Sequence, residues 1–196
     1  MRIGIDVDDT ICSTNETILL EADKYDKEVL GGTGIKNKKA YDFTLMMGWP
    51  KEGKGRFFND RLEYIMDKSP IKDGAVEVIN KLYDEGNEII FITYRKDKYI
   101  KDPYLLTKNY LDRHGIKYNK LIANSGDKGI VCYNNKIDLF IDDSVTHLED
   151  VSLYGIKVLL FDSEYNRDNI KFDRVKNWYQ IYNLIGGENN GREGSK

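Results

Sequence analysis

Four short groups of polar residues in this 196-residue chain could together carry out phosphoryl transfer. They are the segment Asp6–Thr10 (DVDDT), Thr93, Lys128 and the adjacent pair Asp142-Asp143. One carboxylate can attack phosphorus, and a second carboxylate two residues later can act as general acid and then as general base. A hydroxyl and an ammonium group can bind phosphate oxygens. Further carboxylates can bind a divalent metal ion, for which Mg²⁺ with about six oxygen ligands is the expected choice.

The Asp6–Thr10 segment alone has a simpler explanation, because aspartates behind a strand often form a turn or cap the next helix. A calcium-binding EF-hand loop is excluded. Counted from Asp6, its sixth and twelfth positions would need glycine and glutamate, and the chain has Ile11 and Thr17 there.

Three of the four groups directly follow an apolar run, at residues 3–5, 89–92 and 139–141. Such runs are typical of buried parallel strands. Ligands of open α/β sheets bind outside the carboxyl ends of the strands, so we expect these groups to meet in one crevice. At the second strand end, the Thr93 hydroxyl could hold a phosphate oxygen. Arg95 could add a bidentate contact to phosphate or, equally, be a surface cation.

A function for Lys128 and for the acidic pair can be inferred only from their positions relative to the predicted strands and helices. Lys128 alone would be a solvated surface charge, but it begins a short helix just before the strand that ends in Asp142. There it could neutralise the nucleophile and the phosphate together. Adjacent carboxylates are costly to hold close without a cation. Asp143 could also cap the helix that begins near Ser144, which is compatible with a metal ligand at Asp142.

The surrounding sequence predicts the α/β fold class, with strands and helices that alternate along the chain. We expect a doubly wound, parallel, Rossmann-like sheet. The predicted strands cover 2–6, 88–93, 120–123, 137–142 and 157–161, and the predicted helices cover 14–30, 55–67, 73–86, 102–115, 128–134, 145–154 and 174–185. Ser13 and Glu16 have the spacing of a capping box, and Asp73 and Asp102 are expected helix caps.

The stretch between the first two strands has no strand pattern of its own. We therefore predict a core of residues 1–13 and 71–186, and a small, mainly helical cap at 14–70. The polar, glycine-rich segment 187–196 is expected to be disordered. Several cap aromatics could stack on a substrate base, although core packing is favoured for Phe57 and Phe58. The aromatics considered are Tyr41, Phe43, Trp49, Phe57 and Phe58.

Composition limits the classes of partner. The net charge is −3 with a pI near 5.5, so no overall basic field favours a nucleic-acid polymer or a membrane. No apolar stretch reaches the ~18 residues of a membrane helix, and the N-terminus lacks the pattern of a signal peptide. With Cys12 and Cys132 as the only cysteines, reduced thiols in a cytoplasmic protein are expected. His114 and His147 are interpreted as structural or surface residues, and Cys12 as a small core residue.

The set of motifs resembles the haloacid dehalogenase-like superfamily of phosphohydrolases over roughly residues 1–160. Its first motif, Asp-x-Asp-x-Thr after an apolar strand, is matched by Asp6–Thr10, and the others by Thr93, Lys128 and Asp142-Asp143. The chain is most similar to the 5′(3′)-deoxyribonucleotidase family within it. That similarity rests on segments 91–95, 126–132 and 139–144, and on the small helical cap.

The resemblance implies a Mg²⁺-dependent phosphatase that acts on nucleoside monophosphates through an aspartyl-phosphate. It implies that Asp6 is the nucleophile and Asp8 the acid and base. The implied metal site consists of Asp6, the main-chain carbonyl of Asp8, and Asp142. Thr93, Lys128 and Arg95 would bind phosphate, and Thr10 and Asp143 would support the site.

Two alternatives remain open beside a nucleotide substrate. The same chemistry could serve a sugar phosphate or another small phosphomonoester. A receiver-like module could instead bind Mg²⁺ and phosphate without useful turnover. The presence of Asp8 disfavours the silent module, because this residue would hydrolyse the intermediate. The oligomeric state also stays open.

Overall fold

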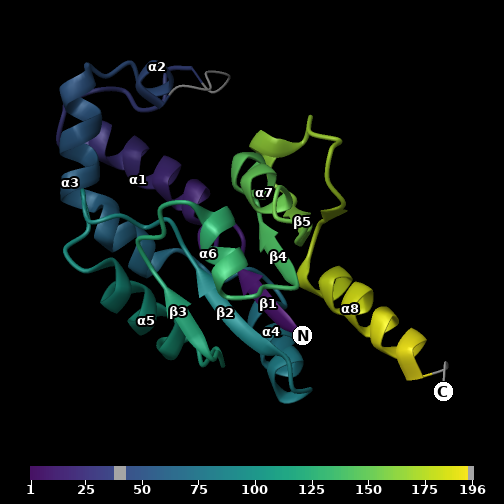
Figure 1. Cartoon of the computed structure of the whole chain (residues 1–196). Helices are drawn as coiled ribbons and strands as arrows, with labels where there is room; N and C mark the ends of the chain where they lie inside the picture. Colours follow the sequence, from purple (N-terminus) through teal and green to yellow (C-terminus); the bar gives the residue numbers. More distant parts are fainter. Residues whose placement is uncertain (38–42, 194–196) are drawn as a thin grey trace.

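Six parallel strands form a single sheet in the order β3-β2-β1-β4-β5-β6. The computed structural model describes residues 1–37 and 43–193 (Figure 1). The strands are β1 (Arg2–Ile5), β2 (Glu88–Ile92), β3 (Lys120–Ile122), β4 (Leu139–Asp142), β5 (Lys157–Phe161) and β6 (Arg174–Val175). The predicted α/β fold with a doubly wound parallel sheet is confirmed.

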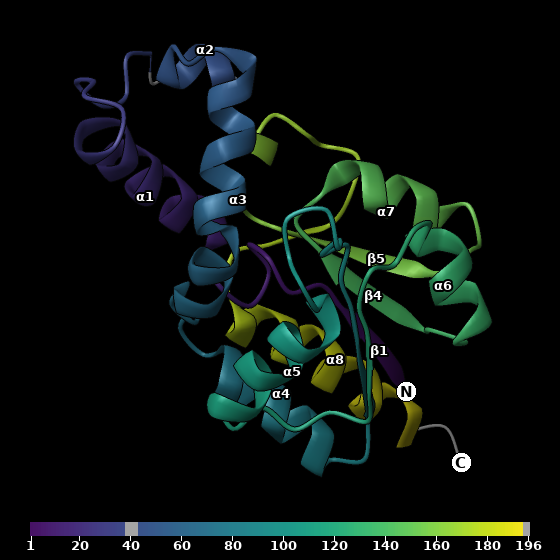
Figure 2. The same ribbon diagram turned by 90° about the vertical axis from the view of Figure 1, so that its left-hand side faces the viewer.

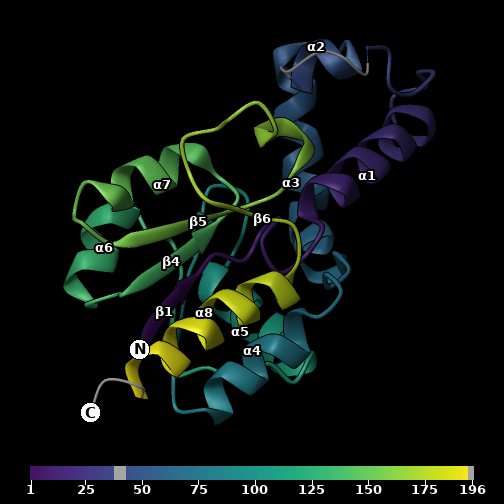
Figure 3. The same ribbon diagram turned by 90° about the vertical axis from the view of Figure 1, so that its right-hand side faces the viewer.

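Helices cover both faces of this sheet, which explains why the central strands are apolar throughout. On one face lie α4 (Ala75–Asp84), α5 (Pro103–Arg113) and α8 (Trp178–Glu193), and on the other α6 (Lys128–Asn134) and α7 (Val145–Ser152) (Figures 2 and 3). Alternate strand residues serve the two cores: Ile89 and Phe91 face the first, Ile90 and Ile92 the second.

Gly4 permits close packing in the middle of β1. A Cβ atom there would lie 2.8 Å from a ring carbon of Phe140 on the neighbouring strand, closer than real contacts allow. A side chain at this position would therefore force the side chains of Phe140 and Ile137 to shift.

Three helices between β1 and β2 form a separate apolar cluster away from the sheet (Figure 1). They are α1 (Thr14–Glu28), α2 (Phe43–Met47) and α3 (Lys51–Lys68). Tyr25 packs edge to face with Trp49 and Phe57, which pack against each other at a tilted angle, and Phe43 stacks on Phe57. Core packing of these aromatics explains why a helical segment can stand beside the sheet. Tyr41, another aromatic considered above, lies outside the described residues.

Several local expectations differ from the structure. Ser13 makes no side-chain cap on α1; the Asp9 carboxylate accepts from Asn15 N–H instead, at 2.9 Å. Gly74, with φ of 76°, rather than Asp73, precedes α4, because the chain turns there through the left-handed region. α2 lies between the predicted helices 14–30 and 55–67, in a stretch for which no helix was predicted.

The C-terminal part also differs. Arg174 and Val175 pair with β5 as an edge strand where a helix was predicted, and α8 begins only at Trp178. It continues to Glu193, into the segment expected to be disordered, since glycine lowers helix stability without forbidding the conformation. Residues 194–196 lie outside the described chain. Among the described helices, none is long and apolar enough to cross a membrane.

Candidate active site

Asp6, Thr93 and Asp142 lie at the carboxyl ends of three adjacent strands. Asp6 N–H donates to the Ile141 carbonyl at 3.0 Å, and Thr93 N–H donates to the Ile122 carbonyl at 2.9 Å. These bonds continue the sheet by one residue beyond β1 and β2, which fixes the direction of both side chains. The strand order reverses between β1 and β4, and ligands of doubly wound sheets bind at this kind of switch point.

Lys128 forms ion pairs with two of these aspartates. Its Nζ lies 2.6 Å from Asp6 Oδ1 and 2.7 Å from Asp142 Oδ2, and the residue is only 1% exposed. The Asp127 side chain caps α6 by accepting from Ile130 N–H, which places Lys128 at the first turn of the helix. The structure thus brings together the distant lysine and the two carboxylates, and a surface position for Lys128 is excluded.

Arg95 reaches the site by an arrangement that the sequence did not indicate. It is 3% exposed, which excludes a surface cation. Its Nε and Nη2 donate to the two carboxylate oxygens of Asp8, at 2.9 and 2.8 Å, and its Nη1 donates to Thr107 Oγ1. The guanidinium therefore forms a bidentate ion pair with Asp8. Its paired N–H donors bind this carboxylate and are not open toward a phosphate.

The two aspartates of the first segment have opposite pKa shifts. Burial raises the pKa of Asp6 to about 7, although Lys128 opposes the shift. Burial also disfavours the charge of Asp8, but the Arg95 guanidinium outweighs it and holds the pKa of Asp8 below its ordinary value. Such opposed environments separate the functions of two carboxyl groups in one site.

A cluster of three buried carboxylates could hold a metal ion. Oxygens of Asp6, Asp142 and Asp143 all lie within 4.8 Å of one another. Burial, together with the nearby charges of Asp142 and Asp6, raises the pKa of Asp143 well above its ordinary value. The carboxylates of this cluster outnumber the single ammonium of Lys128, so negative charge is in excess. Carboxylate oxygens are hard donors, which suit a hard divalent cation such as Mg²⁺. The Asp8 carboxylate points to Arg95, so only its main chain is available to such an ion.

One contributor to the site, His147, was undervalued in the sequence. His147, expected to be structural or on the surface, has its Nδ1 3.2 Å from Asp142 Oδ2 and lines the site cavity. The sequence feature that could have indicated a function for His147 is its position near the start of the helix that follows the acidic pair. The cap of that helix is Ser144, whose Oγ accepts from His147 N–H, so Asp143 is not a helix cap.

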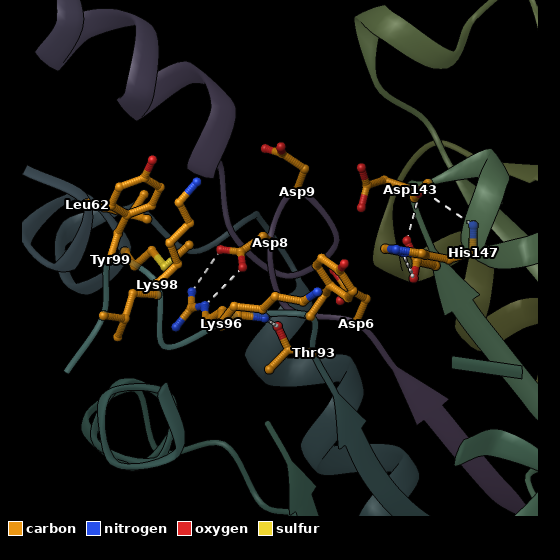
Figure 4. A pocket seen from close by; sticks show the side chains of 16 residues that line it. Asp6, Asp8, Asp9, Leu62, Thr93, Lys96, Lys98, Tyr99, Asp143 and His147 are labelled. Atoms are coloured by element: carbon orange, nitrogen blue, oxygen red, sulfur yellow. Dashed lines mark hydrogen bonds and ion pairs between the residues drawn. The ribbon is translucent and has the colours of Figure 1, made fainter. Parts of the chain in front are cut away.

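The carboxylates open into a cavity of about 430 Å³ (Figure 4). Its floor is polar and includes Asp6, Asp8 and Thr93. Its opposite wall comes from α3 and the loop after β2 and is lined by Leu62, Met66, Tyr99 and Ile100. Figure 4 shows Leu62, Lys98 and Tyr99 on one side of Asp8, and Asp143 and His147 on the other. The aromatics Trp49, Phe57 and Phe58 do not line this cavity.

Residues 1–189 match the family described as 5′ nucleotidase, deoxy (pyrimidine), cytosolic type C, or NT5C. The chain belongs to this family. A nucleotidase of Clostridium acetobutylicum is 30% identical over 190 residues, which cover 94% of this chain and 93% of that protein. A 5′(3′)-deoxyribonucleotidase of Bacillus subtilis is 43% identical over 56 residues, 29% of this chain and 28% of that one.

Solved structures agree with the fold of this NT5C-family protein. A haloacid dehalogenase-like hydrolase of Streptococcus pneumoniae superposes with a TM-score of 0.65 at 11% identity, over 94% of this chain and 97% of that one. A predicted phosphatase of Clostridium acetobutylicum gives 0.66 at 13% identity, over 94% and 97%. The resemblance inferred from the motifs is confirmed: the chain is a phosphatase of the NT5C family, and its fold is that of haloacid dehalogenase-like hydrolases.

Proposed function

We propose that the protein is a Mg²⁺-dependent 5′-nucleotidase that forms an aspartyl-phosphate at Asp6. The observation that carries this proposal is the buried Lys128, which lies between Asp6 and Asp142. An ammonium held there can offset the charge of the nucleophile and of an incoming phosphate, which would otherwise repel each other.

The proposed reaction has two balanced halves. An Asp6 carboxylate oxygen attacks phosphorus, the new O–P bond forms as the ester O–P bond breaks, and the leaving oxygen takes a proton from Asp8. Water then attacks the same phosphorus and gives a proton to Asp8. The acyl phosphate O–P bond breaks, which restores the Asp6 carboxylate and releases inorganic phosphate.

In the structure Asp8 is bound by Arg95 and also accepts from Thr14 Oγ1 at 2.6 Å. This arrangement favours the ionised form that receives a proton from water. The first half-reaction therefore requires Asp8 to take up a proton as substrate binds. We propose that Arg95 orients Asp8 and that Thr93 and Lys128 bind the phosphate.

Asp6, Asp142 and Asp143, with the main-chain carbonyl of Asp8, would hold Mg²⁺. When bound, this ion would neutralise phosphate charge and stabilise the developing charge of the transition state. Thr10 supports the cluster, because its hydroxyl donates to Asp143 Oδ1 at 3.2 Å.

We also propose that residues 14–70 act as a cap over a core of 1–13 and 71–186. Leu62 and Met66 of α3 line the cavity together with Tyr99 and Ile100, opposite the carboxylates. A cavity with one polar end and one apolar wall suits a phosphate joined to a flat, largely apolar group. A nucleoside monophosphate has this form, and the family relationship favours the same substrate.

Phosphate release from a panel of deoxynucleoside, ribonucleoside and sugar monophosphates tests the proposal, with Mg²⁺ present and Asp6→Asn as the blank. Release from nucleoside monophosphates that disappears in the variant is expected. Release from sugar phosphates alone would keep the mechanism and reject the substrate. Full activity of Asp6→Asn would reject the mechanism.

A further inference from the structure

Asp143 differs from its neighbour Asp142 in how its carboxylate is held. Asp142 contacts the Lys128 ammonium and the His147 ring, and it accepts from Ser144 N–H at 2.8 Å. The Asp143 carboxylate instead accepts hydrogen bonds from two hydroxyls, those of Thr10 and Tyr165. Within residues 1–37 and 43–193 no ion pair is formed by Asp143, so its carboxylate depends on these hydroxyls for its direction.

Tyr165 comes from outside the four motifs. It lies in the short 3-10 helix Glu164–Asn166, in the loop that follows β5. Its hydroxyl donates to Asp143 Oδ2 and lies 3.3 Å from Asp9 Oδ2. The hydroxyl thus touches both the acidic pair and the loop that follows β1, at the edge of the cluster.

Asn166 fixes the main chain of the same aspartate. It is buried, and its Nδ2 donates at 2.8 Å to the carbonyls of Asp143 and Phe161. Its Oδ1 accepts from Ser163 N–H and from Arg174 Nη1. The Asn166 Nδ2 group therefore ties the main chain of Asp143 to the end of β5, while Ser163 and Arg174 hold the amide in place through its oxygen.

Arg174 on β6 completes the chain of contacts. Its Nη1 also donates to Asp162 Oδ1 at 2.7 Å, and its Nη2 donates to the carbonyls of Asn166 and Asn169 at 2.7 and 2.9 Å. One guanidinium thereby holds the start and the middle of the loop after β5, and with them the segment that contains Tyr165.

We propose that Tyr165, Asn166 and Arg174 are positioning residues that set the affinity of the acidic cluster for its divalent cation by orienting Asp143. The inference rests on the proposed function, because it assumes that the cluster binds Mg²⁺. Groups that orient metal ligands typically change metal affinity or activity by about 10–100-fold when they are removed. Repulsion from Asp6 and Asp142 would turn a released Asp143 carboxylate away from the ion.

The test is Mg²⁺ binding to Tyr165→Phe, measured by titration calorimetry without substrate. Tyr179→Phe is the matched control: it also removes a hydroxyl bonded to a carboxylate, Glu77, from a tyrosine of similar exposure, 50% against 46%. We expect about tenfold weaker Mg²⁺ binding in Tyr165→Phe and no change in the control. Saturating Mg²⁺ should restore kcat and leave the substrate KM unchanged, which a general loss of structure would not do.

Arg174→Met gives a second measurement, with Arg113→Met as its control. Arg113 likewise binds an aspartate side chain and a main-chain carbonyl, both of Asp67, away from the site. Weaker Mg²⁺ binding in Arg174→Met, with unchanged binding in Arg113→Met, supports the proposal that Arg174 positions Asp143 through Asn166 and Tyr165. Unchanged affinity in both Tyr165→Phe and Arg174→Met would overturn the inference and leave the proposed function intact. Wild-type protein that binds neither Mg²⁺ nor Mn²⁺ would overturn the metal assignment, and this inference with it.

Discussion

Replacing Lys128 by methionine should cost the metal-free protein much of its stability. Methionine has a similar length and no charge, so the variant removes the ammonium from Asp6 and Asp142 and adds no bulk. Both contacts are short, at 2.6 and 2.7 Å, and both carboxylates are buried. Removing one partner of a buried ion pair typically costs about 3–5 kcal/mol, because the remaining charge stays buried without compensation. We expect a loss in that range at pH 8.

The loss should be smaller at pH 5. Burial raises the pKa of Asp6 to about 7 from an ordinary value of 3.8, so between these values the folded protein binds a proton that the unfolded chain does not. The cost of burying this carboxylate is therefore absent below its ordinary pKa of 3.8, grows as the pH rises from there to about 7, and is fully present at pH 8. Without Lys128 the pKa of Asp6 rises further. At pH 5 the Asp6 carboxyl is neutral, so removing the ammonium from it costs little stability.

The assay is urea unfolding in EDTA at both pH values, followed by fluorescence. Lys117→Met is the control, since Lys117 Nζ makes equally short contacts, 2.7 and 2.8 Å, to the exposed Asp84. An exposed pair of this kind contributes at most about 1 kcal/mol. A free-energy loss in Lys128→Met no larger than that in the control at pH 8 would refute the reasoning, since Lys128 would then not compensate the carboxylates.

Three further outcomes are expected. Asp8→Asn should lower kcat by about 10²–10⁴-fold in steady-state assays, because the variant cannot exchange protons; an unchanged kcat would assign the acid and base elsewhere. Asp26→Ala should destabilise the helical cluster by roughly 1–3 kcal/mol in thermal unfolding, since buried Trp49 Nε1 loses its acceptor at 2.5 Å; an equal melting temperature would show that water replaces it. Cys12 and Cys132 should resist iodoacetamide at pH 8 until the chain is unfolded, because burial raises the pKa of each thiol to about 12; mass spectrometry of the folded protein would reveal rapid labelling if this is wrong.

The sequence predicted the sheet and its site well where the signal was local and strong. The runs 3–5, 89–92 and 139–141 are apolar on both faces, and the polar residues behind them had to lie at one edge of the sheet. Lys128 could be selected among many lysines only through its place before β4. Its burial and its two contacts depend on the packing of α6 beside α7, which no local pattern reveals.

Other features depend on contacts between distant segments. The two residues of β6 have no strand signal of their own; β5 and the Arg174 contacts hold them in place. Asp9 rather than Ser13 serves the start of α1, because the loop after β1 folds back with Asp9 at φ of 58°. His147 was set aside because its distance in sequence from the other histidine excluded zinc, whereas its actual partner is a carboxylate.

Asp6 and Asp8 are identical residues in one short segment, and the structure separates them through the cations that each receives. Asp8 has the guanidinium of Arg95, which matches its charge and both of its oxygens. Asp6 shares the single ammonium of Lys128 with Asp142, and Asp143 lies beside them. The Asp8–Arg95 pair, whose charges balance, suits a group that exchanges protons. The cluster around Asp6 has fewer positive than negative charges, which suits a divalent cation and an anionic substrate bound together. The division of function within the segment therefore follows from the placement of one arginine, from the loop after β2, and one lysine, from the first turn of α6.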